Sequence, residues 1–246
     1  MIAVVSPAAY WSVVAAAALG CAALSIAARR RPGPWRRYVA WGIGVALAWD
    51  VVAYSVGLGL AGTWSAKTSL PLALCNIGVV VASVACFFQV PLLVELTYFI
   101  GLAGTLQAVL TPDLSVAFPH LVFFEYLIGH LGIVFAAVFL VVGLELVPRR
   151  GAVSRVFWIS AAYTAFVGLI DATTGADYMF LRSPPREWTL LRLLGPWPWY
   201  VLSAAAVALV LFNLLDLPFR HGRDLAARSP RTPGPRVHFP LVGRAR

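Results

Sequence analysis

Long apolar stretches alternate with short polar breaks along the whole chain. A helix needs about 20 apolar residues to cross roughly 30 Å of hydrocarbon. Seven stretches are predicted as membrane-spanning helices, at about 8–28, 38–60, 70–90, 92–110, 120–147, 156–175 and 198–217. The third and fourth meet at Gln89–Pro91, which predicts a tight helical hairpin, and the fifth is long enough to require a tilt. We therefore expect an all-α polytopic bundle in residues 1–219.

Composition narrows the class of protein further. The chain is 61% hydrophobic and 12% charged, with a mean hydropathy of +0.83, whereas soluble domains carry about 45–50% apolar and about 25% charged residues. A net charge of +9 would suggest nucleic acid as a partner of a soluble protein. Here the basic residues flank predicted spans, so we expect no nucleic acid. Residues 220–246 are predicted to be a basic, disordered tail near anionic headgroups.

The distribution of basic residues predicts the orientation. With the N-terminus outside, 15 of the 19 Arg and Lys residues lie in predicted cytoplasmic segments, and 4 lie in external ones. Because cytoplasmic loops carry the excess of basic residues, the sequence predicts an N-out, C-in topology with an odd number of spans.

Two reactive side chains lie inside predicted spans. Cys75 lies near the outer end of the third span, and His130 lies in the outer half of the fifth. Ionisable groups in hydrocarbon are costly, so they are functional candidates. A thiol and an imidazole together can form an activated nucleophile. Cys75 and His130 are therefore the candidate catalytic pair.

Other polar groups are predicted at about the same depth. Asp50 or Asp171 would orient the imidazole, and Asn76 or Gln107 would donate to an oxyanion. The same groups would also serve as a structural hydrogen-bond network between helices, and the sequence does not separate these interpretations.

The remaining intramembrane groups are interpreted as structural. Cys21 and Cys86 are expected to behave as small hydrophobic side chains. Glu95 and Glu125 are interpreted as packing charges, or as charges that reach toward the interface.

Several short motifs together resemble a known family. They are Leu70–Ile77, Leu110–Leu114, Phe118–His120, Gly129–His130, Asp177–Leu181 and Leu194–Tyr200. In combination, over about residues 35–215, they resemble the YwaF-like integral membrane proteins of bacteria. That family is similar to a vertebrate transmembrane acyltransferase that builds ether phospholipids with an embedded Cys and His. More distantly it resembles the androgen-induced family of lipid hydrolases, in which Thr replaces the Cys.

The resemblance implies a chemistry for particular positions. It makes Cys75 the nucleophile and His130 the base, and it makes Asp177 and Tyr178 possible substrate-binding residues, although Asp177 stands where the family usually has Asn. The expected protein is a lipid acyltransferase or ester hydrolase of the bacterial plasma membrane. It would act on membrane lipids without a metal or cofactor. The rival hypotheses are a transporter or small-ligand binder that uses the same polar groups, and a structural protein without a site.

Overall fold

The computed structural model is all-helical and describes residues 7–112, 121–184 and 190–228. The long helices are α1 (Pro7–Arg30), α2 (Trp35–Leu60), α3 (Leu74–Phe88), α4 (Pro91–Ile100), α6 (Leu121–Val138), α7 (Ala152–Thr174) and α8 (Trp199–Arg228). The π-helical turn η1 (Gly101–Thr105) and α5 (Leu106–Leu110) continue α4, and η2 (Phe139–Gly143) continues α6. Two 3-10 helices, η3 (Tyr178–Phe180) and η4 (Leu190–Leu194), lie between α7 and α8.

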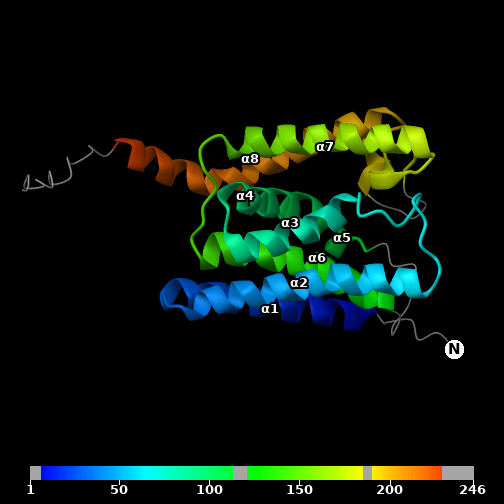
Figure 1. The fold of residues 1–246 in the computed structure, drawn as a ribbon. Coiled ribbons are helices and arrows are strands. Elements are labelled where there is room, and N and C mark those ends of the chain that lie inside the picture. Colours follow the sequence, from blue (N-terminus) through cyan, green and yellow to red (C-terminus); the bar gives the residue numbers. More distant parts are fainter. Residues whose placement is uncertain (1–6, 113–120, 185–189, 229–246) are drawn as a thin grey trace, which may run out of the picture.

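The helices run roughly parallel to one axis and form three layers (Figure 1). Helices α1 and α2 form one outer layer, α3, α4 and α6 the centre, and α7 with α8 the other outer layer. Within the described residues, six helical segments are long and apolar enough to cross a membrane, and α3 is shorter. The predicted all-α bundle is thus confirmed. The chain is a multi-pass membrane protein, while its orientation stays a prediction.

The third predicted span is shorter than expected because its first residues are held as a loop. Helix α3 begins at Leu74 rather than near residue 70. The N–H of Leu70 donates to Tyr178 Oη at 2.9 Å, and the carbonyl of Leu72 accepts from Tyr163 Oη at 3.0 Å. The predicted hairpin after α3 is present: Gln89 adopts a left-handed conformation (φ 52°), and Pro91 begins α4.

The fifth and seventh predicted spans also end elsewhere. The fifth ends at Gly143, not near residue 147, because the chain leaves the helix at Glu145 (φ 60°). Helix α8 continues past Pro218 to Arg228. It therefore enters the segment 220–246 that the sequence predicts to be disordered, and the rest of that segment lies outside the described residues. The motif residues at positions 113–120 lie outside them as well.

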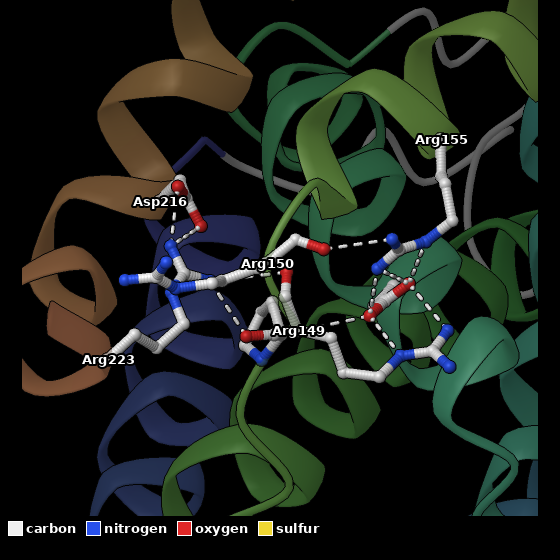
Figure 2. Close-up of polar contacts among 7 residues, drawn as sticks. Arg149, Arg150, Arg155, Asp216 and Arg223 are labelled. Atoms are coloured by element: carbon white, nitrogen blue, oxygen red, sulfur yellow. Dashed lines mark hydrogen bonds and ion pairs between the residues drawn. The ribbon is translucent and has the colours of Figure 1, made fainter. Parts of the chain in front are cut away.

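Buried Glu95 anchors the connection between α6 and α7. Its side chain is 1% exposed. Arg149 donates to it from Nε at 2.8 Å and Nη2 at 3.1 Å, and Arg155 from Nη2 at 2.9 Å. These bonds raise the pKa of the Arg149 guanidinium. Figure 2 shows both arginines converging on this carboxylate, while Arg223 reaches Asp216. Glu95 is thus a packing charge, as predicted, with two partners that the sequence does not identify.

Candidate functional site

Cys75 lies in the first turn of α3, next to the end of the bundle at which α1 begins. Its thiol is free, and its side chain is partly buried. The first N–H groups of a helix have no intrahelical partner and carry a partial positive charge. The late start of α3 therefore brings the thiol closer to these groups than the sequence predicts. At such a position the helix dipole offsets part of the cost of a buried thiolate.

The hydroxyl of Thr105 lies beside the thiol of Cys75. Thr105 ends the π-helical turn η1 and is completely buried. Its contact with the thiol falls short of a well-formed hydrogen bond, so Thr105 Oγ1 is a buried hydroxyl without a partner among the described residues. An unpaired buried hydroxyl costs about 1–3 kcal/mol, and π-helical turns occur frequently at functional sites. Sequence reasoning missed Thr105 because a threonine in an apolar helix gives no distinct signal.

His130 is oriented by its own helix. Its Nδ1 lies 2.7 Å from the carbonyl oxygen of Tyr126, one turn earlier in α6. Its ring stacks on the Tyr126 ring with centroids 4.1 Å apart. Since a carbonyl can only accept, Nδ1 carries the proton and Nε2 has the lone pair of a base. The Tyr126 carbonyl therefore holds the imidazole on one side, and an orienting role of Asp50 or Asp171 stays a prediction.

Thr105 and His130 lie at the same level of two facing helical segments. At one end of their contact, Tyr126 Oη donates to the carbonyl of Ala108 at 2.6 Å. At the other end, a Cβ added to Gly101 would lie 3.0 Å from Cγ2 of Ile133. Thr105 and His130 each lie about one turn from both contacts. Among the described residues, no hydrogen bond joins Cys75 directly to His130, and Thr105 lies next to the thiol on the segment that faces α6.

A second group of polar side chains lies beside Cys75. Asp50, Tyr54, Asn76 and Glu125 line a small pocket of about 40 Å³. Asp50 is 6% exposed. Its carboxyl group and that of Glu125 are close enough to interact electrostatically. A Cβ added to Gly129 would lie 3.1 Å from Asp50 Oδ2, a tight contact, so glycine leaves room for this carboxyl beside α6. The predicted neighbours Asp50 and Asn76 do come together, and Glu125 joins them.

Gln107 and Asp171 are engaged elsewhere. Gln107 Nε2 donates to the carbonyl of Ala103 in its own helix at 2.9 Å. Asp171 is completely buried at the end of α7, and its Oδ1 accepts the N–H of Tyr178 at 3.0 Å. The predicted roles of Gln107 and Asp171 in the site stay predictions.

Asp177 and Tyr178 hold loops together. Tyr178 Oη donates to the carbonyl of Ala66 at 2.9 Å and accepts the N–H of Leu70. Asp177 accepts the N–H of Arg182 at 2.8 Å and the hydroxyl of Ser183. Substrate binding by either residue stays a prediction. In the part of the chain that the structure describes, no cluster of three or more His, Cys, Asp or Glu side chains is arranged to hold a metal ion.

Comparison with protein families identifies the family of this chain. The sequence model of the TMEM164 family matches residues 4–216. The chain belongs to the TMEM164 family. Comparisons with curated proteins and with solved structures gave no match.

The TMEM164 family match covers every candidate residue discussed above and all the candidate spans except the end of the last one. It establishes membership of a membrane protein family, in agreement with the six candidate spans. The YwaF-like and acyltransferase resemblances rest on the motifs alone and stay predictions.

Proposed function

We propose that this TMEM164-family protein is an intramembrane acyltransferase or ester hydrolase. Cys75 is its nucleophile, and His130 is its general base. The substrates are membrane lipids whose ester groups reach the end of the bundle at which α3 begins. The motif resemblance supports this proposal, together with the arrangement of Cys75, Thr105 and His130.

One observation carries the proposal. A fully buried hydroxyl, Thr105 Oγ1, is left without a hydrogen-bond partner where it faces a thiol at a helix start. Ser25 Oγ is unpaired beside the thiol of Cys21 in the same way, and the position of Cys75 in the first turn of a helix is what distinguishes the Thr105 pair. His130 supports the same conclusion, because its tautomer leaves Nε2 free to accept a proton.

The mechanism follows from these positions. His130 Nε2 takes the thiol proton of Cys75, and the sulfur attacks the carbonyl carbon of a lipid ester. The N–H groups at the start of α3 stabilise the oxyanion, as does the Asn76 side chain. The ester C–O bond breaks, the imidazolium returns its proton to the leaving alkoxide, and a thioester remains on Cys75. A lysolipid hydroxyl or water then attacks the thioester, with His130 again taking the proton, which finally returns to the sulfur.

Transfer of label between lipids tests the proposal. Purified protein in bilayers receives a phospholipid with a labelled acyl chain and an unlabelled lysolipid, and products are separated by mass. We expect labelled phospholipid built on the lysolipid, and no turnover in Cys75→Ser or His130→Ala. Cys86→Ser is the matched control, because Cys86 lies further along the same helix, away from Thr105 and His130. Release of free fatty acid alone would identify a hydrolase, and equal turnover in Cys75→Ser would refute the proposal.

The polar pocket favours one second candidate function. Asp50 and Glu125 form no ion pair with a basic residue in the described parts of the chain, although both lie within membrane-spanning helices. Uncompensated acidic groups at this depth are typical of cation or proton pathways. A small-cation binder would bind its ligand equally well in Cys75→Ser and lose binding in Asp50→Asn.

A further inference from the structure

Two apolar recesses between the described helices are candidates to hold an acyl chain. The larger, about 750 Å³, is a groove between α1, α2 and α6, lined by residues that include Tyr10, Leu47 and Leu131. The smaller, about 100 Å³, lies between α3, α4, α6 and α7. Size alone favours the larger groove, because ligand pockets are commonly about 300–1,000 Å³.

Position favours the smaller cavity. Its lining includes Gly78, Gly101 and Ile133. Each lies one helical turn from a residue of the candidate site: Gly78 from Cys75, Gly101 from Thr105, and Ile133 from His130. Residues three or four apart share a helix face, so this cavity lies within one turn of all three site residues. Neither recess is lined by the site residues themselves, and the larger groove comes within one turn of His130 alone, at Leu127.

The smaller cavity also lowers the stability of the fold. Gly78 is a buried glycine inside α3, where alanine would favour the helix by about 1 kcal/mol. A Cβ at Gly78 would lie 3.4 Å from Ile133 Cδ1, which is an ordinary contact. Alanine would therefore fit and fill part of the space. Helix propensity does not explain a glycine at this position, whereas a bound apolar group that fills the space does.

We infer that this cavity binds the first methylene groups of the acyl chain carried by Cys75. The inference rests on the proposed function and adds a subsite to it. At roughly 30 Å³ for each small group, the cavity holds about three methylene groups. The remainder of the chain leaves between α7 and the central helices toward the surrounding lipid.

The acyl subsite predicts a particular dependence on chain length. The test measures kcat/KM for release of 4-nitrophenolate from 4-nitrophenyl acetate, butyrate, hexanoate and octanoate by the purified protein. The kcat/KM of each variant is divided by that of the wild type for the same ester. Partition of the ester into detergent then cancels. Burial of one methylene group is worth about fourfold in rate. For Gly78→Ala we expect a ratio near one for acetate, which falls about fourfold by hexanoate and then stays constant.

Leu131→Ala is the matched control, because Leu131 lies next to His130 in sequence but lines the larger groove. Its ratio should be the same for all four esters. If the ratio instead falls with acyl-chain length in Leu131→Ala and stays flat in Gly78→Ala, the acyl chain binds in the larger groove. That result would overturn the inference and leave the proposed function standing. A flat ratio in both variants would also overturn it. Release that is as fast in Cys75→Ser as in wild type would refute the proposed function, and the subsite with it.

Discussion

Replacement of Thr105 by valine should make the protein more stable and less active. Valine keeps the shape of the side chain and removes the buried hydroxyl, which has no hydrogen-bond partner among the described residues. The removal of an unpaired buried polar group should stabilise the fold by about 1 kcal/mol. For a protein of this size, that gain raises Tm by roughly 2–4 °C.

Thr105→Val should also slow the acylation of Cys75, although it stabilises the fold. In the proposed reaction the Thr105 hydroxyl donates a hydrogen bond to the thiolate sulfur. Hydrogen bonds to charged groups are worth about 1.5–3 kcal/mol, so Thr105→Val should slow acylation of Cys75 by roughly 10- to 150-fold. Thr105→Ser, which keeps a hydroxyl, should recover most of the rate. The assays are thermal unfolding in detergent and the rate of Cys75-dependent ester cleavage.

Ser25 provides the control for this pair of effects. Its hydroxyl is also buried, at 1% exposure, has no hydrogen-bond partner among the described residues and faces the thiol of Cys21. Ser25→Ala should therefore raise Tm as Thr105→Val does and leave ester cleavage unchanged. A Thr105→Val protein that is more stable and fully active would show that the hydroxyl has no part in the chemistry, and the reasoning about Thr105 would be refuted.

Three further predictions concern the bundle. Glu95→Gln should destabilise it by about 2–4 kcal/mol in unfolding experiments, because a buried carboxylate loses its charge beside two arginines. The same change at Glu145, whose pair with Arg29 is exposed, should cost under about 1 kcal/mol, and equal losses would contradict the argument. Tyr178→Phe should increase proteolysis of the loop 61–73, which loses two hydrogen bonds, and unchanged cleavage would argue against that anchor. Reporter fusions after residues 65, 115 and 190 should all report an external location; an internal signal at any one would overturn the predicted topology.

The long helices of the bundle were predictable from the sequence, because apolar stretches of about 20 residues indicate helices that can cross a bilayer. The hairpin at Gln89–Pro91 was predictable for a local reason, since Pro91 cannot continue a helix and is well suited to begin one. The late start of α3 was not predictable. It depends on hydrogen bonds from Tyr163 and Tyr178, which lie about a hundred residues away in the chain.

The candidate site also combines residues that were predictable from the sequence with residues that were not. Cys75 and His130 were predictable, because titratable groups are conspicuous in apolar sequence. Thr105 was not, because a hydroxyl in a helix usually bonds to a backbone carbonyl of the preceding turn, as Thr97 does at 2.8 Å. Asp171 was placed in the site from its depth alone. Its actual partner is the N–H of Tyr178, which follows it after a turn at Gly175.

The central claim is that Cys75 carries the acyl group during turnover, and peptide mass spectrometry tests it most directly. The protein is incubated in bilayers with phospholipid, quenched in acid, digested and analysed with and without neutral hydroxylamine, which cleaves thioesters. The account predicts a hydroxylamine-sensitive acyl adduct on the peptide that contains Cys75, its loss in Cys75→Ser, and no adduct on Cys21 or Cys86. Lipid turnover without an adduct on Cys75, or an adduct confined to Cys21 or Cys86, would contradict it.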